Sequence, residues 1–536
     1  MRVLTAQQMR DIECDAITSG RHSGLDLMER AGAGVVERVL ARWPDLAVVP
    51  HRAVVLCGPG NNGGDGYVIA RLLSERGWEV DVHGMGRVET MPPDAAESRR
   101  RWEAIGPVAP LDSVAGEGAD LIVDAIFGTG LSRGFAPLDQ VGALFHGLFA
   151  DGFWGHGQEV APHVVAVDIP SGLDADSGKV LWVDAQWCGD VAAHLTVTFH
   201  QPKLGHVLAD GPFYCGALEV VDIGLADRSC GVPLARLPDP MQAEPNLGKG
   251  HGAHKFDHGH ALVVTGGMGR TGAARLAARA ALRVGAGLVT LAAPGPAIME
   301  CAAQITSLML RRCDGAEGLT ETLGDRRMRA ICLGPGLGTG AETRALVHAA
   351  LRVGADVGRG LSVVLDADAL SCFAGAEAEV MPELRSCAVI TPHGGEFARL
   401  FPDLAERLVA RVKTGPAFSK LDATVAAAQR AGCVVVLKGP DTVIASPDGR
   451  TCIHAAAYDR AAPWLATAGS GDVLAGIITG LLARGLDPFW AAQAGVYLHV
   501  EAARLFGLGL IAEDLPDLLP EVLRRILHGE HGKTAP

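Results

Sequence analysis

Short apolar strands that end in glycine-rich turns, each followed by a helix, recur along the whole chain. Residues 53–57 end in GPGNNGGDG (58–66), residues 121–124 lead into AIFGTG, and residues 164–168 end in IPSGLDAD. The same alternation returns from residue 261 onward. Strand, glycine turn and helix in repetition predict an α/β fold built on doubly wound parallel sheets. In such folds ligands bind at the carboxyl ends of the strands, where these turns lie.

One break interrupts the alternation. Between residues 226 and 252, four prolines follow the last strand expected in the first half, and a segment rich in glycine and histidine comes after them. That composition is typical of a linker, and 536 residues suffice for two large α/β domains. We therefore expect a first domain over residues 1–225, the linker over 226–252, a second domain over 253–527 and a polar, disordered tail over 528–536.

Composition excludes several classes of partner. The net charge is −14 and no long basic run occurs, so nucleic acid and acidic membrane surfaces are not expected to bind. No stretch of about 18 uninterrupted apolar residues is present, and the N-terminal segment lacks the apolar core of a signal peptide. The 12 cysteines are scattered and form no CxxC pair. This cysteine usage predicts a cytoplasmic protein in a reducing compartment.

The segment 466–482 reads ATAGSGDVLAGIITGLL. Small residues over 467–471 precede Asp472, and an apolar helix is expected from Val473 onward. Backbone N–H groups at a glycine-rich helix start bind phosphate. A carboxylate beside them can meet a phosphate and a substrate hydroxyl together. The segment therefore predicts a phosphoryl-transfer site.

Oxygen-bearing side chains follow three strands of the first half. Asn62 and Asp65 lie in the turn after residues 53–57, Asp124 ends the strand 121–124, and Asp168 ends the strand 164–168, with Ser171 in the turn after it. Because the carboxyl ends of parallel strands lie at one edge of a sheet, these side chains are expected to converge. Oxygens from Asn62, Asp124 and Ser171 are suited to one hard cation.

Glycine turns also follow the strands of the second half. GPGLG (334–338), LDADAL (365–370) and TPHGGE (391–396) each come directly after an apolar run, and KGPDTVI begins at Lys438. Lys438 is placed to meet a nucleotide phosphate, although a lone lysine at a strand end is often only solvated. Together with GSGD, these turns predict a nucleotide site at the strand ends.

With these motifs the chain resembles the bifunctional NAD(P)H-hydrate repair enzymes. LMERAG, PGNNGGDG, VDAIFGTGLSRG and DIPSGLDAD are similar to the signatures of the epimerase half of that family. GAARLAARAALRVGAGLVT, LGPGLG, LDADAL, TPHGGEFARL, LKGPDTVI and TAGSGDVLAG are similar to those of its ADP-dependent dehydratase half. The resemblance covers nearly the whole chain. It implies a Rossmann-like N-terminal domain and a ribokinase-like C-terminal domain.

The resemblance also implies site residues. The hydrated dinucleotide is expected at Asn61, Asn62, Gly63, Gly64, Asp65, Gly66, Gly128, Thr129, Gly130, Leu131, Ser132, Arg133, Gly134 and Asp168. Potassium is expected at Asn62, Asp124 and Ser171. In the second half the substrate is expected at Ala273, Gly336, His393 and Asp472, and AMP, the product of ADP, at Lys438, Gly439, Pro440, Asp441, Thr442 and Gly471.

The implied substrates are the hydrates NADHX and NADPHX, which carry a hydroxyl at C6 of the nicotinamide ring. Transfer of a phosphoryl group from ADP converts that hydroxyl into a good leaving group, with Asp472 as the base and Mg²⁺ and the GSG amides carrying phosphate charge. Epimerisation of the R and S forms needs an acid/base near C6. Asp168 is the first candidate, and Asp124, expected to bind the cation, is the second.

Two other readings stay open at this point. The glycine motif of the second half also fits an ATP-dependent kinase of small molecules. Epimerase-like domains also occur in messenger-RNA decapping scaffolds, although the acidic charge argues against RNA. A homo-oligomer is expected, but the sequence fixes neither the number of subunits, nor a preference between NADHX and NADPHX, nor whether the two sites channel substrate.

Overall fold

Two units make up the chain in the computed structural model. It describes residues 2–116, 118–134, 141, 144–145, 162–181, 192–226, 230–233, 247–385 and 387–527. Unit 1 comprises Met1–Pro233 with Ala410–Ser419, and unit 2 comprises Leu234–Val409 with Lys420–Pro536. The predicted tail over 528–536 and most of the predicted linker over 226–252 lie outside the described residues.

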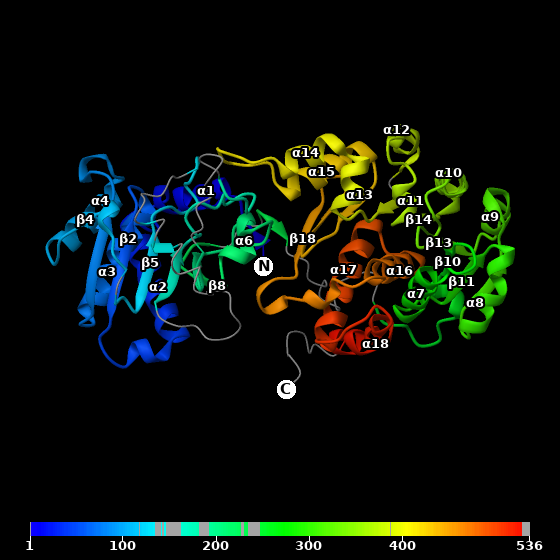
Figure 1. Cartoon of the computed structure of the whole chain (residues 1–536), viewed down its shortest axis with the longest axis horizontal. Coiled ribbons are helices and arrows are strands. Elements are labelled where there is room, and N and C mark those ends of the chain that lie inside the picture. Colours follow the sequence, from blue (N-terminus) through cyan, green and yellow to red (C-terminus); the bar gives the residue numbers. More distant parts are fainter. Residues whose placement is uncertain are drawn as a thin grey trace. The chain divides into compact units, whose positions relative to one another are not determined.

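Unit 1 contains a seven-stranded sheet in the order β4-β3-β2-β5-β6-β7-β8 (Figure 1). Every pair in it is parallel. Its strands are β2 (Arg52–Cys57), β3 (Glu79–Gly84), β4 (Ala109–Pro110), β5 (Leu121–Ala125), β6 (His163–Val167), β7 (Leu195–Phe199) and β8 (Ala217–Val221). Outside it, β1 (Arg2–Val3) pairs antiparallel with β9 (Val232–Pro233). The predicted parallel α/β sheet is confirmed.

Both faces of this sheet are buried, which explains why its strands are apolar throughout. In β2, Val55 and Cys57 belong to one core, while Val54 and Leu56 belong to another on the opposite face. The helices of unit 1 are α1 (Ala6–Thr18), α2 (Gly24–Arg42), α3 (Asn61–Glu75), α4 (Pro93–Glu103) and α6 (Gly211–Tyr214). Helices α1 to α4 contribute to the first of these cores.

The NNGGDG segment was predicted as a turn, and that prediction is wrong, because α3 already begins at Asn61. Close packing explains the glycines. A Cβ atom on Gly63 would collide with the Gly58 carbonyl. A Cβ atom on Gly66 would lie 2.8 Å from the sulfur of Cys57. The start of α3 can therefore approach the sheet only without side chains at these positions.

Unit 2 contains a nine-stranded sheet in the order β12-β11-β10-β13-β14-β15-β16-β17-β18. It is parallel as far as β16 and antiparallel at β17 and β18. Its strands are β10 (His260–Val264), β11 (Leu288–Ala293), β12 (Met309–Arg312), β13 (Met328–Leu333), β14 (Ser362–Leu365), β15 (Ala388–Ile390), β16 (Val434–Leu437), β17 (Asp441–Ala445) and β18 (Thr451–Ala455). The predicted α/β class is confirmed for this unit as well.

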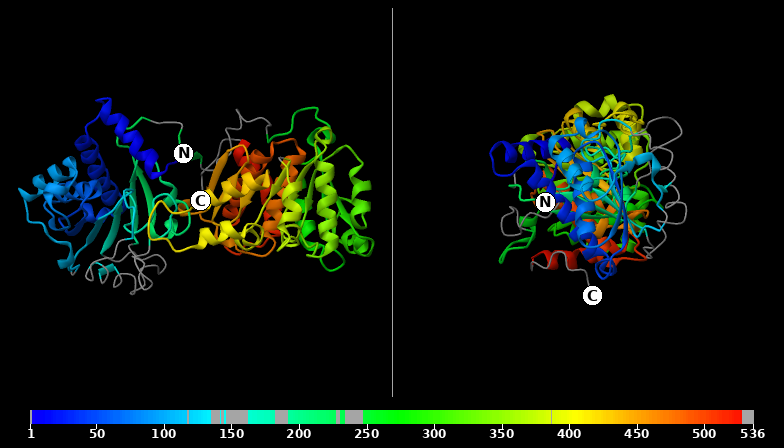
Figure 2. Two further views of the ribbon diagram at one scale, coloured as in Figure 1. Left: turned by 90° about the horizontal axis from the view of Figure 1, so that it is seen from above. Right: turned by 90° about the vertical axis from the view of Figure 1, so that its left-hand side faces the viewer.

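Helices cover the sheet of unit 2 (Figure 2). They are α7 (Gly272–Arg283), α8 (Ile298–Gln304), α9 (Gly315–Leu323), α10 (Ala341–Gly354), α11 (Asp368–Ser371), α12 (Glu377–Val380), α13 (Gly394–Leu400), α14 (Pro402–Val409), α15 (Lys420–Ala431), α16 (Ser470–Ala483), α17 (Pro488–Phe506) and α18 (Asp514–Leu527). Helix α16 packs against α7 and α17. A Cβ atom on Gly476 would collide with the backbone of Ala277, so the contact with α7 requires glycine there.

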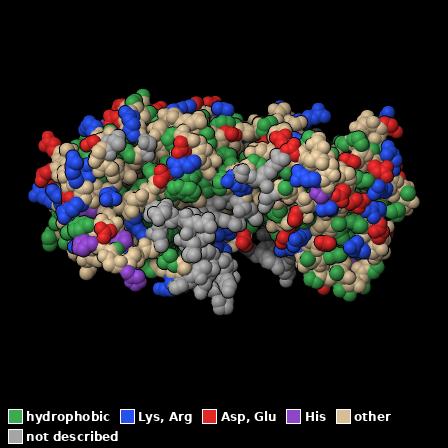
Figure 3. Space-filling view, turned by 180° about the vertical axis from the view of Figure 1, so that it is seen from behind, with side chains coloured by type: hydrophobic (Ala, Val, Ile, Leu, Met, Phe, Trp, Pro, Cys, Tyr) green, Lys and Arg blue, Asp and Glu red, His purple; other side chains and the backbone are tan. Residues whose placement is uncertain are grey.

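Charged side chains of both signs lie on the surface. On the face shown in Figure 3, acidic and basic side chains are interspersed, and no extended basic area is seen on it. None of the helices in the described part of the chain combines the length and apolar character needed to cross a membrane.

Candidate active sites

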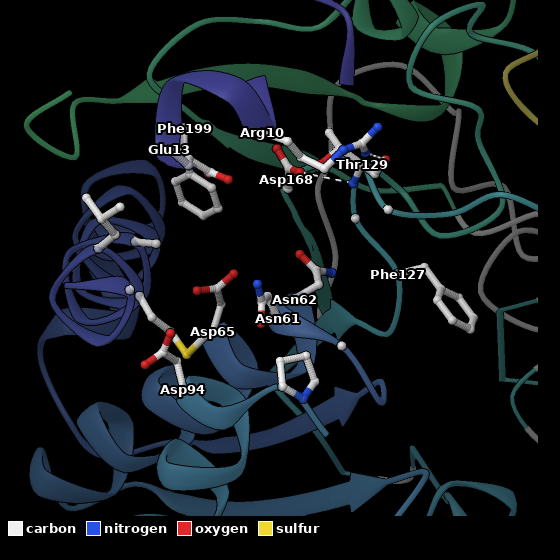
Figure 4. Close-up of a pocket in the computed structure, with 18 of the residues that line it drawn as sticks. Arg10, Glu13, Asn61, Asn62, Asp65, Asp94, Phe127, Thr129, Asp168 and Phe199 are labelled. Atoms are coloured by element: carbon white, nitrogen blue, oxygen red, sulfur yellow. Dashed lines mark hydrogen bonds between the residues drawn. The ribbon is translucent and has the colours of Figure 1, made fainter. Parts of the chain in front are cut away.

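A cavity of about 440 Å³ lies in unit 1, at the carboxyl ends of β2, β5 and β6 (Figure 4). Eight of the residues predicted to contact the dinucleotide line it, namely Asn61, Asn62, Asp65, Gly128, Thr129, Gly130, Leu131 and Asp168. A Cβ atom on Gly128 would lie 2.9 Å from Oδ1 of Asn62 and 3.1 Å from Oδ2 of Asp168. The start of α3, the loop after β5 and the end of β6 therefore meet, as the strand-end argument predicted.

The other predicted contacts of unit 1 are not among the residues that line this cavity. Gly63, Gly64 and Gly66 are buried within α3, where their lack of a side chain permits close packing. Ser132, Arg133 and Gly134 continue the loop after Leu131. Within unit 1, the segment 410–419 holds the backbone of this loop. The N–H of Gly415 donates to the Ser132 carbonyl at 3.0 Å, and the N–H of Gly134 donates to the Lys413 carbonyl at 2.8 Å.

Asp168 is held as an anion by three donors. Lys203 Nζ and Thr198 Oγ1 donate to its Oδ1 at 2.8 and 2.9 Å, and the backbone N–H of Thr129 donates to Oδ2 at 3.1 Å. Burial is the strongest single influence and opposes its ionisation, but the charge and hydrogen bond of Lys203, together with His206 and the Thr129 N–H, lower the pKa of Asp168 to about 2. Its backbone has a φ of 67°. Such strain in a residue other than glycine is often found at functional sites.

Asp124 lies behind the cavity wall and is fully buried. Its carboxylate accepts hydrogen bonds from the Ser171 hydroxyl at 2.6 Å and from the backbone N–H groups of Ser171 and Ile126 at 2.8 and 3.2 Å. Burial raises the pKa of Asp124 to about 6, although the bonds from Ser171 act in the opposite direction. All three donors are neutral, so a cation beside this carboxylate would stabilise its ionised form.

Asn62 adds to the same region. Its side-chain Nδ2 is buried and has no hydrogen-bond partner among the described residues. Asn62 adjoins Gly128, and the Ser171 hydroxyl contacts the neighbouring Phe127, accepting from its N–H at 2.9 Å. The oxygen donors of Asn62, Asp124 and Ser171 and the uncompensated carboxylate fit a monovalent hard cation.

The cavity wall also contains side chains that were not predicted as site residues, among them Arg10 and Glu13 of α1, Asp94 of α4 and Phe199 at the end of β7. No glycine turn announces them. A weaker signal was present for Glu13. Met9, Ile12 and Ala16 form the buried stripe of α1, and Glu13 interrupts that stripe at helical spacing. An acid on the buried face of a helix needs an explanation.

The second cluster lies in unit 2, where β13, β14, β15 and β16 are neighbours in the sheet. The residues that follow these strands therefore meet at one edge. Nζ of Lys438, after β16, lies 2.7 Å from Oδ1 of Asp366, after β14, and 3.9 Å from Oε2 of Glu396 in α13. The Thr391 hydroxyl donates to the same oxygen of Asp366 at 2.7 Å. Asp366 and Glu396 were not among the predicted site residues, although both lie in the motifs LDADAL and TPHGGE.

Asp472 adjoins this group. It lies within the first turn of α16, so the prediction that the helix begins at Val473 is wrong. A Cβ atom on Gly471 would lie 3.4 Å from Nζ of Lys438, which brings the amine close to the helix start. Burial, followed by the charge of Asp366, raises the pKa of Asp472 to about 7, and Lys438 acts in the opposite direction.

The remaining predicted residues of unit 2 also lie at turns and helix starts. Ala273 is in the first turn of α7, Gly336 has a φ of 72° in the turn after β13, and His393 caps α13, where its Nδ1 accepts from the N–H of Gly395 at 2.9 Å. The turn after Lys438 is closed by Thr442, whose hydroxyl donates to the Gly439 carbonyl at 2.7 Å.

The other two residues of that turn are also engaged. The Pro440 carbonyl accepts from the N–H of Ala456 at 2.7 Å. Asp441 Oδ1 pairs with Lys420 Nζ at 2.5 Å.

Two family models match the chain, one in each half. Residues 24–205 match the family model of the YjeF-related protein N-terminus. Residues 261–525 match the family model of NAD(P)H-hydrate dehydratase. The first match encloses the cavity residues from Gly24 to Phe199, and the second encloses the Lys438 cluster.

Individual proteins show the same division. The bifunctional NAD(P)H-hydrate repair enzyme Nnr of Moorella thermoacetica is 36% identical over 98% of this chain and 97% of its own length. The NAD(P)H-hydrate epimerase of Rhodobacter capsulatus is 46% identical over 38% of this chain and 91% of its own. A crystal structure of the ADP/ATP-dependent NAD(P)H-hydrate dehydratase of Bacillus subtilis, co-crystallised with ATP/Mg²⁺, is 27% identical, covers 56% of this chain and 100% of that one, and has a TM-score of 0.44. The full-length match shows that the chain belongs to the family of bifunctional NAD(P)H-hydrate repair enzymes.

Proposed function

We propose that this protein restores NADH and NADPH from their hydrates. Unit 1 interconverts the R and S hydrates, and unit 2 dehydrates the S hydrate at the expense of ADP, giving AMP and phosphate. The observation that carries the proposal is the pairing of Asp472 with the glycine-rich start of α16, next to the Lys438 amine. A base, phosphate-binding amides and a cation are the parts that phosphoryl transfer needs.

In unit 2, Asp472 takes the proton of the C6 hydroxyl as that oxygen attacks the β-phosphorus of ADP. AMP leaves, and the resulting phosphate ester is eliminated together with a proton from C5, which restores the nicotinamide ring. Lys438, Gly439, Pro440, Asp441, Thr442 and Gly471 contact the nucleotide, and Ala273, Gly336 and His393 contact the hydrate. Asp366 and Glu396 outnumber the Lys438 amine, so ADP enters as its Mg²⁺ complex, in which the metal offsets phosphate charge.

The pKa of Asp472, raised to about 7, suits this role. A general base works best when its pKa lies near the working pH, because it is then ionised in a large fraction of molecules and still binds a proton firmly. Asp366 is less accessible as a base than Asp472, because the Lys438 amine and the Thr391 hydroxyl already donate to one of its oxygens.

In unit 1, the cavity holds the hydrated nicotinamide between α3, the loop over 128–134 and Asp168. The side chains of Asn61, Asn62 and Asp65 and the backbone of the loop supply polar contacts to the dinucleotide. Asp168 contacts the substrate as a fixed anion. Its low pKa and its three donors favour that role over the proton transfer predicted for it from the sequence.

A potassium ion is proposed at Asn62, Asp124 and Ser171. The support is the fully buried Asp124 carboxylate, which has only neutral donors, and the Ser171 hydroxyl that is bonded to it. The ion would fix the loop after β5, because Ser171 contacts both Asp124 and Phe127. It would supply positive charge behind the cavity and take no part in bond making.

One assay tests the whole proposal. A racemic mixture of R and S hydrate is incubated with the protein, ADP and Mg²⁺, and the near-UV absorbance of reduced nicotinamide is followed. Complete recovery is expected, because unit 1 feeds the R form to unit 2. Recovery of only half of the absorbance would contradict the epimerase assignment. No recovery, with ATP-dependent phosphorylation of another small molecule instead, would identify a kinase.

The cellular location and the domain boundaries are also part of the proposal. Every cysteine among the described residues is a free thiol, which supports a reducing, cytoplasmic location. We also propose residues 1–225 and 253–527 as the two catalytic domains, joined by residues 226–252. The expected homo-oligomer stays a prediction.

A further inference from the structure

Glu13 of α1 faces the cavity of unit 1 together with two other acids. Figure 4 shows its carboxylate pointing into the cavity that Asp65 enters from α3 and Asp168 from the end of β6. These three carboxylates come from separate elements and surround the space proposed for the hydrated ring. The activity proposed for unit 1 requires a proton to be exchanged there, and the three acids differ in their ability to do so.

Asp168 is the least able to carry a proton. Lys203 Nζ, Thr198 Oγ1 and the Thr129 N–H occupy its oxygens at 2.8 to 3.1 Å. Protonation would break the ion pair with an amine that is itself only 1% exposed. Leaving a buried ammonium without its partner is strongly unfavourable. Asp168 therefore keeps its negative charge throughout the reaction.

Asp65 is limited in the opposite way. It is buried in α3, and burial, reinforced by the charges of Asp168 and Glu13, raises the pKa of Asp65 well above its ordinary value. Burial therefore favours its neutral form over its ionised form. A carboxyl group in a site that favours its neutral form is suited to donate a hydrogen bond to a substrate and is a poor base.

Glu13 lies between these extremes. No hydrogen bond to its carboxylate is found among the described residues, so neither of its oxygens is committed. Charged groups face it from each neighbouring element, namely Arg10 on α1, Asp65 on α3, Asp168 after β6 and Lys203 after β7; Asp94 of α4 lines the same cavity. Burial raises the pKa of Glu13 to about 7, with Lys203 opposing that rise. Both of its protonation states are therefore populated at neutral pH.

We propose that Glu13 is a catalytic residue of the epimerase, which protonates the C6 hydroxyl of the hydrate and later takes a proton from the water that returns to C6. In the first step the C6–O bond breaks, its electron pair leaves with the oxygen as water, and the N1 lone pair forms an N1=C6 iminium. In the second step water adds to the opposite face of C6, and its proton passes to the Glu13 carboxylate. The inference rests on the proposed function of unit 1.

The neighbouring charges fit this sequence of steps. The iminium is a cation, and the fixed Asp168 carboxylate stabilises it electrostatically, since it needs no reorganisation when the positive charge forms. No oxidant or reductant is needed. The enzyme regains its starting protonation state after each turnover, because the proton given to the leaving oxygen returns from the incoming water.

The test uses full-length protein carrying Glu13→Gln. Pure R hydrate is supplied without ADP, so that unit 2 is idle, and formation of the S form is followed by chromatography, with the rate without enzyme subtracted. We expect kcat to fall by at least about 10²-fold, the scale of general acid–base loss, while KM changes less than about threefold. The control is Asp11→Asn, an exposed acid on the same helix, which should epimerise at the wild-type rate.

Further readouts separate catalysis from a structural role. Wild-type epimerisation should slow as the pH rises through about 7, because Glu13 then loses the proton it donates, and Glu13→Gln should lack this dependence. Glu13→Asp keeps the acid and should recover part of the rate. ADP-dependent dehydration of the S hydrate by the same variants reports on folding of the chain.

The outcomes are distinct. Glu13→Gln that epimerises within about threefold of wild type, with the same pH profile, overturns the inference and leaves the epimerase function standing. If Glu13→Gln and Glu13→Asp are equally slow and both have a raised KM, Glu13 has a structural role, and this result also overturns the inference. Wild-type protein that fails to epimerise overturns the proposed function of unit 1 itself.

Discussion

Replacing Asp472 with asparagine should move activity and stability in opposite directions. Asparagine keeps the size and the hydrogen-bonding capacity of the side chain but removes the base and the charge. Asp472 lies in the first turn of α16, one helical position past Gly471, and its carboxylate is surrounded by Asp366, Glu396 and Lys438. The substitution therefore probes both the reaction and the free energy of burying this charge.

The effect on activity follows from the role of a base. ADP-dependent dehydration should fall by at least about 10²-fold. The wild-type rate should rise as the pH increases through about 7, because Asp472 must be ionised to accept the hydroxyl proton. The variant should lack this rise. The affinity for ADP should change little, because its phosphates rest on the helix amides and on the turn that begins at Lys438.

The effect on stability has the opposite sign. Burial raises the pKa of Asp472 from 3.8 to about 7, so between these pH values the folded state binds more protons than the unfolded state. The free energy of unfolding therefore falls as the pH rises over this range, and the loss is complete above about pH 7. Each tenfold change in the acid dissociation constant is worth about 1.4 kcal/mol, which gives an upper bound of about 4 kcal/mol. The asparagine variant escapes this loss.

The measurements are a pH–rate profile for each activity and denaturant unfolding at pH 5 and pH 8. The stability advantage of the variant should grow between the two pH values, and its epimerase activity should equal that of the wild type. Dehydration at the normal rate would refute the catalytic role and leave Asp472 as a first-turn residue whose charge only interacts with the helix dipole. A variant with an unchanged pH–rate profile would assign the titration to another group.

Three further predictions concern charge, cation and packing. Lys438→Met leaves two buried carboxylates without their amine and should destabilise unit 2 by about 3 kcal/mol or more in denaturant unfolding, whereas Arg430→Ala, which breaks an exposed pair, should cost no more than about 1 kcal/mol. Ser171→Ala should raise the potassium concentration needed for half-maximal epimerisation about tenfold or more, measured against choline chloride at constant ionic strength, with dehydration unchanged. Gly63→Ala, whose Cβ meets a backbone carbonyl, should destabilise unit 1 by about 1 to 3 kcal/mol, whereas Gly60→Ala, with open space around it, should leave the melting temperature of unit 1 near that of the wild type.

The sequence predicted the central strands well, because parallel strands buried on both faces are apolar without interruption. The expected runs 53–57, 121–124 and 164–168 agree within one residue with β2, β5 and β6. Edge strands gave no such signal. Strand β12, Met309–Arg312, reads MLRR and exposes three of its four side chains, so nothing in its composition separates it from a loop.

Helix starts were the weaker part of the prediction. The sequence predicts helices that begin after NNGGDG and at Val473, yet α3 begins at Asn61 and α16 at Ser470. Glycine disfavours helices when a chain is considered alone. Here the close approach of each helix to its neighbours, at Gly63 and at Gly476, outweighs that preference. Tertiary packing of this kind cannot be read from local propensity.

Site residues on strand-end turns were found from the sequence because parallel topology brings them together. Glu13 was not, because a single acid on a helix has no local motif and its neighbours come from four other parts of the chain. The fixed state of Asp168 was missed for the same reason. Its ammonium partner, Lys203, follows a different strand, and only the fold places the two 2.8 Å apart.

The environment of that pair explains how unit 1 obtains an acid near neutrality. Lys203 neutralises Asp168 and leaves the neighbouring Glu13 without a dedicated cation. Asp168 is thereby held in its charged form. For Glu13, burial is stronger than the remaining attraction to the same amine, and the pKa of Glu13 rises to about 7.

Unit 2 uses the same arrangement on a different sheet. Lys438 pairs with Asp366 at 2.7 Å, and Asp472, which is near both, has its pKa raised to about 7. Burial and the charge of Asp366 outweigh the attraction of Lys438, so Asp472 is left as a group that titrates near the working pH. A second amine placed beside Asp472 would lower its pKa and weaken it as a base, while loss of the first would leave the buried acids uncompensated. The position of Lys438 is therefore matched to the proton transfer proposed for Asp472, and the charges beside such a base are constrained by chemistry as much as by stability.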